Sequence, residues 1–201
     1  MIVYRVFDKT SRGCYDGEAP LLTLQQVHGT EVIDADDISD YAQEPQADAA
    51  VTTKRGLVLG IKTADCAPVL LYDVQQGVIA AAHCGWRSTK ANILAQVVGL
   101  MRQKGATEVH AIIGPAIHQA NYVVDQAFYD AMVTDEPRAR HLFQARYYFD
   151  LPGFIRLKLH TLNVAAVIDH CEDTYINSSK YYSYRRDKDT QRMLTTIMLS
   201  R

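Results

Sequence analysis

Two short apolar runs with a turn between them constrain the fold of this chain more than any other feature. Residues 69–72 and 78–82 predict buried strands, and residues 73–77 between them predict a turn. Strands joined by so short a connection pair in the antiparallel direction. Cys66, just before the first strand, and His83, just after the second, are therefore expected at the same edge of a sheet.

This sheet edge collects side chains that can do chemistry. Residues 62–68 contain Asp65 and Cys66, and residues 83–87 contain His83 and Arg87. A thiol beside an imidazole fits a metal site, and it equally fits a cysteine hydrolase in which His83 activates Cys66 as the nucleophile. The spacing of the residues leaves both interpretations open.

Length and charge limit the class of protein. A chain of 201 residues with 48% hydrophobic content can bury a full core, and we expect one domain over residues 1–201. The net charge of -2 gives no reason to expect a nucleic acid or an anionic membrane as partner, because these need a basic patch. No signal peptide or membrane-spanning run is apparent, so we expect a cytoplasmic protein with free cysteines. The oligomeric state stays open.

Further strands and helices define the expected fold class. Strand-like runs occur at residues 57–61, 109–113, 164–168 and 193–199, and candidate helix N-caps occur at Ser88, Asp125 and Asp150. Strands joined by tight turns as well as by helices predict a mixed α/β (α+β) fold, a layered sandwich with a mixed central sheet and flanking helices.

A third segment adds a second imidazole. Residues 25–32 alternate as a strand would, with His28 beside Gly29. Two histidines and one cysteine, His28, His83 and Cys66, would give three protein ligands and leave a fourth position open, as in catalytic zinc sites. Copper also accepts this set of donors, so the sequence alone does not settle the metal.

Three other features have two interpretations each. We expect Asp65 to have one of two roles: it orients a histidine, or it caps the turn before Pro68. Arg87 directly precedes the Ser88 cap. We expect it either to bind a phosphate or to pair with a surface carboxylate. Residues 180–187 alternate aromatic and polar side chains, which favours a half-buried strand.

Six motifs follow one another in a fixed order: residues 26–29 (QVHG), 47–49 (ADA), 63–69 (TADCAPV), 83–87 (HCGWR), 113–115 (IGP) and 184–187 (YRRD). With these motifs the chain resembles the YfiH-like family, also called the laccase-domain or multicopper polyphenol oxidase family. Residues 10–13 (TSRG) are similar to a reduced form of the family's N-terminal element, which includes Arg12.

The resemblance implies a YfiH-like fold and a zinc ion held by His28, Cys66 and His83, which are also the expected catalytic residues. It implies a purine nucleoside phosphorylase that uses phosphate and acts on adenosine, inosine, guanosine and methylthioadenosine, with adenosine deaminase activity as a second, hydrolytic reaction. Arg87, Asp65 and Arg12 are the expected substrate-binding residues. The alternatives are the Cys66 hydrolase, a copper-dependent polyphenol oxidase (laccase) and a non-catalytic, metal-stabilised binding module.

Overall fold

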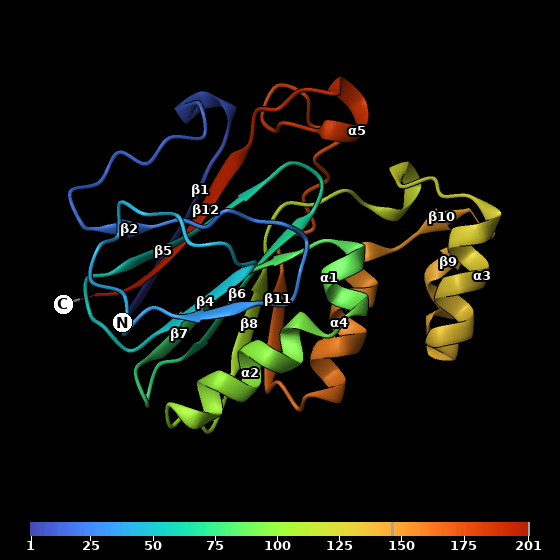
Figure 1. The fold of residues 1–201 in the computed structure, drawn as a ribbon. Coiled ribbons are helices and arrows are strands. Elements are labelled where there is room, and N and C mark those ends of the chain that lie inside the picture. Colours follow the sequence, from blue (N-terminus) through green and yellow to red (C-terminus); the bar gives the residue numbers. More distant parts are fainter. Residues whose placement is uncertain (146, 201) are drawn as a thin grey trace.

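Two β-sheets and a group of helices stack as layers in the computed structural model, which describes residues 1–145 and 147–200 (Figure 1). The larger sheet has the strand order β11-β8-β6-β7-β4-β3 and contains parallel and antiparallel pairs. Its strands are β3 (Val32–Asp34), β4 (Ala49–Thr52), β6 (Ala67–Asp73), β7 (Val78–Cys84), β8 (His110–Ile113) and β11 (Ala166–Asp169). The predicted mixed α/β sandwich with a mixed central sheet is confirmed.

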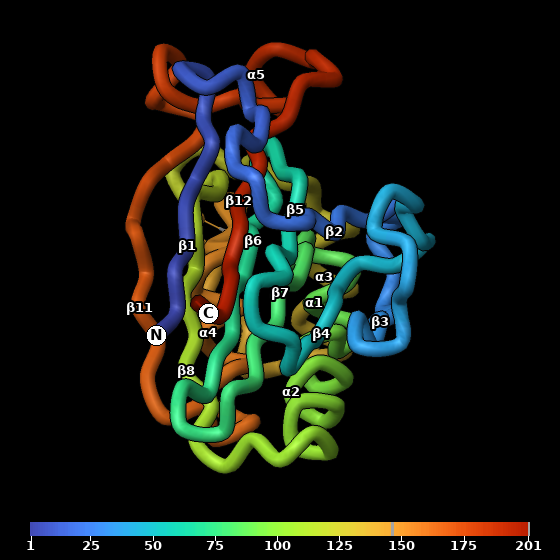
Figure 2. Tube along the Cα trace, turned by 90° about the vertical axis from the view of Figure 1, so that its left-hand side faces the viewer, coloured from blue at the N-terminus to red at the C-terminus, as the bar shows by residue number. Residues whose placement is uncertain are grey.

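The smaller sheet has the order β1-β12-β5-β2. Its strands are β1 (Ile2–Phe7), β2 (Leu21–Leu22), β5 (Val58–Thr63) and β12 (Met193–Leu199). A separate two-stranded sheet pairs β9 (Phe143–Gln144) with β10 (Tyr148–Phe149). Figure 2 shows β1 and β12 of the smaller sheet and β6 and β8 of the larger one running lengthwise through the molecule, with α5 (Tyr184–Asp187) at one end.

Two of the helices begin where an aspartate side chain satisfies one of their first backbone N–H groups. Asp125 accepts from Phe128 N at the start of α3 (Gln126–Asp135), and Asp150 accepts from Gly153 N at the start of α4 (Leu151–Thr161). Both predicted caps are confirmed. The remaining helical elements are α1 (Trp86–Lys90), α2 (Ile93–Gln103) and the 3-10 turns η1 (Lys9–Ser11), η2 (Gln119–Asn121) and η3 (Pro137–Leu142). None of the helices described is long and apolar enough to span a membrane.

The central strands β6 and β7 of the larger sheet are buried on both faces, which explains their unbroken apolar character. Leu71 and alternate residues of β6 belong to the core that also contains Ile93 and Val97 of α2 and Ile155 of α4. Leu70 points to the opposite face, where the core includes Ile61 of β5 and Ile197 of β12. The central hairpin is therefore held between a layer of helices and a second sheet.

The hairpin register brings the predicted site residues to one edge. Ala67 lies opposite Cys84, and Pro68 lies opposite His83. Cys66 directly precedes β6, so the expectation that it meets His83 at the same edge of the sheet is confirmed.

Residues 25–32 do not form the predicted strand. Only Gln25 makes an isolated bridge, to Gln46, and β3 begins at Val32. His28 has a left-handed backbone with φ 61°. The N–H groups of the loop are taken by a buried side chain, that of Asp48, instead of by a neighbouring strand.

The prediction of a strand over residues 180–187 is also wrong. Ser183 accepts a hydrogen bond from Arg186 N and caps the short helix α5. The Arg186 guanidinium donates to three backbone carbonyls, at 2.8 Å to Thr174, 2.7 Å to Tyr175 and 3.0 Å to Tyr181. These bonds fold the segment onto the preceding loop, and a strand there would break them.

Ser88 is not the N-cap predicted for the helix after β7. Gly85 occupies the cap position of α1, and the Ser88 hydroxyl, one turn into the helix, accepts from Gly85 N and donates to His83 O. Asn92, with φ 66°, separates α1 from α2, so the predicted single helix is two.

Candidate metal centre and substrate cavity

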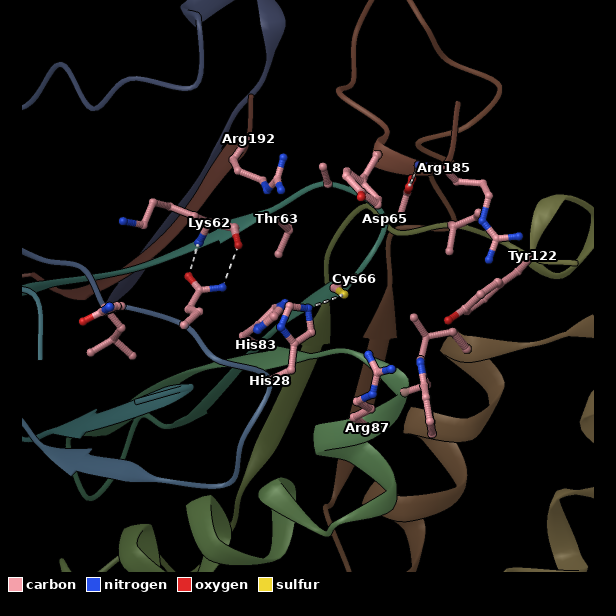
Figure 3. A pocket seen from close by; sticks show the side chains of 18 of the residues that line it. His28, Lys62, Thr63, Asp65, Cys66, His83, Arg87, Tyr122, Arg185 and Arg192 are labelled. Atoms are coloured by element: carbon pink, nitrogen blue, oxygen red, sulfur yellow. Dashed lines mark hydrogen bonds between the residues drawn. The ribbon is translucent and has the colours of Figure 1, made fainter. Parts of the chain in front are cut away.

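Three side chains from separate parts of the chain converge beside the hairpin (Figure 3). His28 comes from the loop before β3, Cys66 from the turn before β6, and His83 from β7. Their ligand atoms all lie within 4.8 Å of one another, and Cys66 Sγ is 3.9 Å from His28 Nε2. Two imidazole nitrogens and a sulfur form a donor set that can hold a transition metal.

Asp48, immediately before β4, organises two of these three residues. Its carboxylate accepts hydrogen bonds from the backbone N–H groups of Val27 at 3.1 Å, His28 at 2.9 Å and Gly29 at 2.7 Å. The same carboxylate lies 2.7 Å from His83 Nδ1, and it is fully buried. An ionised carboxylate only accepts, so His83 Nδ1 carries the proton and Nε2 is the nitrogen free to bind a metal.

Opposing effects set the charges of the centre when no metal is bound. Burial alone would raise the pKa of Cys66, but hydrogen bonds with His28 and His83 lower it to about 6. Burial alone would lower the pKa of His83, but its bonds to Asp48 and Cys66 raise it to about 9. At neutral pH, Cys66 is therefore a thiolate and His83 an imidazolium, so metal binding must release the proton of His83.

The backbone around the centre approaches closely at Gly85. A Cβ atom at this position would lie 3.0 Å from Cys66 Sγ and 3.2 Å from His28 Cδ2, so a larger residue would displace the donors. Cys84, its neighbour, points the other way into the core and is fully buried. Burial raises the pKa of Cys84, which is unsuited to complete the donor set.

The donors lie in a cavity of about 990 Å³. Its lining includes aromatic rings, cationic groups and two carboxylates: Trp86, Tyr122 and Tyr184; Lys62, Arg87, Arg185, Lys188 and Arg192; Glu44 and Asp65. Lys62 pairs with Glu44 at 2.7 Å. The volume is at the upper end of the range for small-molecule sites, and the lining suits a ligand with a flat ring and negative charge.

The other predicted site residues have different positions. Arg87 lines the cavity, and its guanidinium lies 4.7 Å from the centre of the Trp86 ring, with no hydrogen bond or carboxylate partner among the residues described. Asp65 also lines the cavity, but its oxygens accept from Thr174 Oγ1 at 2.8 Å and from Arg185 N at 2.6 Å. It orients a neighbouring segment, whereas the carboxylate that orients His83 belongs to Asp48.

Arg12 does not line the cavity. It ends η1 in a left-handed conformation, φ 56°, beside the start of β12. The structure therefore brings together His28, Cys66, His83, Arg87 and Asp65, and it leaves Arg12 outside this group.

Several residues of the centre and the cavity had no role assigned from the sequence. Asp48 lies in the ADA motif, where a carboxylate between two buried alanines is itself a signal, because an isolated buried charge must have partners. Tyr122 directly follows η2, and this segment carries no comparable signal. Arg185 lies 5.1 Å from the Tyr122 ring and donates to Val123 O at 2.6 Å.

Comparison with known proteins gives consistent results. The family described as multi-copper polyphenol oxidoreductase laccase matches residues 9–200. Purine nucleoside phosphorylase RC0672 of Rickettsia conorii is 38% identical over 200 residues, which span 97% of this chain and 82% of the relative. Purine nucleoside phosphorylase YfiH of Escherichia coli is 32% identical over 179 residues, which span 88% of this chain and 72% of the relative.

Solved structures share the fold. Neisseria meningitidis protein NMB0706 superposes with a TM-score of 0.83 at 32% identity, covering 91% of this chain and 76% of that one. YlmD of Geobacillus stearothermophilus gives a TM-score of 0.76 at 26% identity, covering 91% of this chain and 74% of that one.

We predict that Cys66 in metal-free protein reacts with iodoacetamide at half its maximal rate near pH 6, the pKa of about 6 held by its two histidines. Only the thiolate reacts, so the rate rises with pH through this value. Mass spectrometry would follow the modification in a Cys14→Ser/Cys171→Ser background, because both of those cysteines are exposed. His83→Gln should move the midpoint upward, and a wild-type midpoint near the ordinary value of about 8.5 would contradict the prediction.

Proposed function

The chain belongs to the multi-copper polyphenol oxidoreductase laccase family, also called YfiH-like, and from this membership we propose that it is a zinc-dependent purine nucleoside phosphorylase. The observation that carries the proposal is the meeting of a His-Cys-His donor set with cationic and aromatic side chains in one cavity. The names of its relatives supply the reaction.

In the proposed centre His28, Cys66 and His83 hold the metal. Bound zinc would supply a Lewis acid beside the substrate. Zinc suits the mixed nitrogen and sulfur donors, and copper is the alternative. Asp48 holds the ring of His83 and the backbone of His28, and it thereby orients two of the three proposed ligands.

Phosphorolysis requires an anion beside the sugar. A phosphate oxygen forms a bond to the ribose C1′ atom while the bond from C1′ to the purine nitrogen breaks, and the base leaves with the electron pair. C1′ carries developing positive charge in this step, and a phosphate held close by stabilises it. Arg87 is the proposed phosphate ligand, because its guanidinium lines the cavity without a carboxylate partner among the described residues.

The sequence suggested that the start of α1 and Arg87 bind the same anion, and our proposal relies on Arg87 alone. Gly85 N at the helix start already donates to Ser88 Oγ at 3.1 Å, and α1 is only five residues long. The purine ring would stack on one of the aromatic faces that line the cavity, Trp86, Tyr122 or Tyr184.

The finer assignments belong to the same proposal. Adenosine, inosine, guanosine and methylthioadenosine are the proposed nucleosides, and adenosine deamination is a second proposed activity. A single domain over residues 1–201 and a cytoplasmic location stay predictions, as do the substrate contacts of Asp65 and Arg12.

We expect purified protein to release hypoxanthine from inosine only when phosphate is present, and to carry about one zinc per chain. His28→Ala and Cys66→Ala should each lose the zinc and the activity, because each removes one of three proposed ligands. Cys14→Ser is the matched control, since this cysteine is exposed and outside the cavity, and it should keep both.

Base release that does not depend on phosphate would refute the phosphorylase. The alternative is a hydrolase in which Asp48, His83 and Cys66 act as a catalytic triad, which their contacts permit. This hydrolase would need neither a metal nor His28. A hydrolytic activity that survives His28→Ala and zinc removal would therefore favour it. Visible absorption from bound copper together with oxygen consumption would favour the polyphenol oxidase.

We predict that Asp48→Asn lowers zinc affinity by about 10- to 100-fold, the usual effect of losing a carboxylate that orients a ligating histidine. Competition with a chromogenic chelator would measure it. Asp73→Asn is the matched control, because Asp73 is also buried and accepts N–H bonds from Gln76, Thr107 and Glu108, but does not line the cavity. Equal zinc affinity in the two variants would contradict the role of Asp48.

We predict that Arg87→Met raises the KM for phosphate at least about tenfold with a smaller change in the KM for inosine, since a hydrogen bond to a charged group contributes about 1.5–3 kcal/mol. Steady-state kinetics with each substrate varied in turn would show it. Arg102→Met, which removes a guanidinium bonded to Leu162 O outside the cavity, should leave both constants unchanged. A rise confined to the KM for inosine would place the phosphate elsewhere.

A further inference from the structure

Asp65 lies where four segments that are distant in the sequence come together. It directly precedes Cys66 in the turn before β6, and Figure 3 shows it between Cys66 and Arg185. One carboxylate oxygen accepts a hydrogen bond from Arg185 N at 2.6 Å, at the start of α5, and the other accepts from Thr174 Oγ1 at 2.8 Å. The backbone carbonyl accepts from Ile117 N at 2.9 Å. The turn that carries the sulfur donor is therefore tied to three other parts of the chain.

The backbone of Asp65 has a conformation that suits glycine better than aspartate. Its φ of 83° is in the left-handed region, which costs free energy for a residue with a Cβ atom. A turn that required only this backbone would be more stable with glycine. The side chain is 9% exposed, and each of its oxygens has a donor within the protein. A strained residue persists where its surroundings hold it, so the position indicates a role for the carboxylate.

Arg185 continues this connection along the wall of the cavity. Its guanidinium donates to Val123 O at 2.6 Å and lies 5.1 Å from the centre of the Tyr122 ring. Both Arg185 and Tyr122 line the cavity that contains the metal donors. A series of contacts thus leads from Asp65 through Arg185 to the wall at Tyr122.

We propose that Asp65 is a positioning residue, which holds Arg185 and the cavity wall beside it in place relative to the metal donors. In this role it acts through Arg185 and not through the substrate contact that the family resemblance implies. A shift of about 1 Å in an active site can lower the rate about 100-fold, so a residue that does not touch the substrate can still control the reaction. The expected effect on activity rests on the proposed function, whereas the expected effect on Arg185 does not.

The Asp65→Asn substitution separates positioning from a direct role. The new amide has one acceptor oxygen for Arg185 N and two donor hydrogens, and the Thr174 hydroxyl can accept one of these. Both positioning contacts therefore remain, while the ionisable group is lost. We expect kcat/KM for inosine with phosphate to stay within about threefold of the wild-type value in Asp65→Asn. It should fall at least about tenfold in Asp65→Ala, which removes both contacts.

Thr174 provides the second half of the test, because it is fully buried and lies outside the cavity. Thr174→Val keeps the shape of the side chain and leaves the bond from Arg185 N to Asp65, so we expect a loss of less than about threefold in kcat/KM. In the double variant Asp65→Asn/Thr174→Val the amide hydrogens have no hydroxyl to accept them. The loss should then exceed the product of the two single losses, which shows that the residues are coupled. A substrate contact of Asp65 predicts independent effects instead.

The backbone amide of Arg185 gives a readout that does not depend on activity. Its hydrogen exchange, followed by NMR spectroscopy on the zinc-loaded protein, should be at least about tenfold faster in Asp65→Ala and little changed in Asp65→Asn. Asp73→Ala is the matched control, because Asp73 is also buried and accepts from Thr107 Oγ1 and backbone N–H groups, but does not line the cavity. It should leave both the exchange of the Arg185 amide and kcat/KM unchanged.

Three results would overturn the positioning role. They are equal losses of kcat/KM in Asp65→Asn and Asp65→Ala, an unchanged exchange rate of the Arg185 amide in Asp65→Ala, and independent effects in the double variant. If Asp65→Ala does not fold, the comparison of Asp65→Asn with the double variant decides between the two roles. If the wild-type protein does not cleave inosine with phosphate but the Arg185 amide still responds to Asp65→Ala, the positioning role stands and the phosphorylase fails.

Discussion

The carboxylate of Asp48 is the group on which both histidines of the centre depend. It is fully buried, and it takes one imidazole N–H and three backbone N–H groups. Burial alone would raise the pKa of Asp48, but these bonds hold it below its ordinary range, so the charge persists inside the protein. His28 and His83 therefore share one support, whereas the hairpin register positions Cys66 separately.

The strands and the sheet edge could be predicted because they depend on local patterns. An apolar run bounded by a turn predicts a buried strand. The proximity of Cys66 and His83 could be predicted from the hairpin alone. At residues 25–32 and 180–187 the alternating pattern of side chains predicted strands that do not form. In both segments side chains make the backbone hydrogen bonds that a neighbouring strand would make. Asp48 binds the N–H groups of one segment, and Arg186 binds carbonyls around the other.

The partners within the site could not be predicted from spacing. Asp65 and Arg185 are 120 residues apart in the sequence, and Asp48 and His83 are 35 apart. A sequence motif identifies a residue, but it does not show which other residues that residue contacts in the fold. Asp65 was thus expected to orient a histidine or cap a turn, and it binds Arg185 N instead. Arg12, selected for its similarity to a family element, lies outside the cavity because η1 folds beside the start of β12.

Asp65 connects the metal-binding donors of the cavity with the segment that carries its cationic side chains. It directly precedes Cys66, its backbone is left-handed with φ 83°, and its carboxylate holds the start of α5. The segment that follows carries Arg185, Lys188 and Arg192 to the same cavity as the donors. The net charge of -2 is therefore an average over the chain, and it includes a cavity lined by several cations. It argues against long polyanions, which need an extended basic face, but a small anion responds only to the few charges around it.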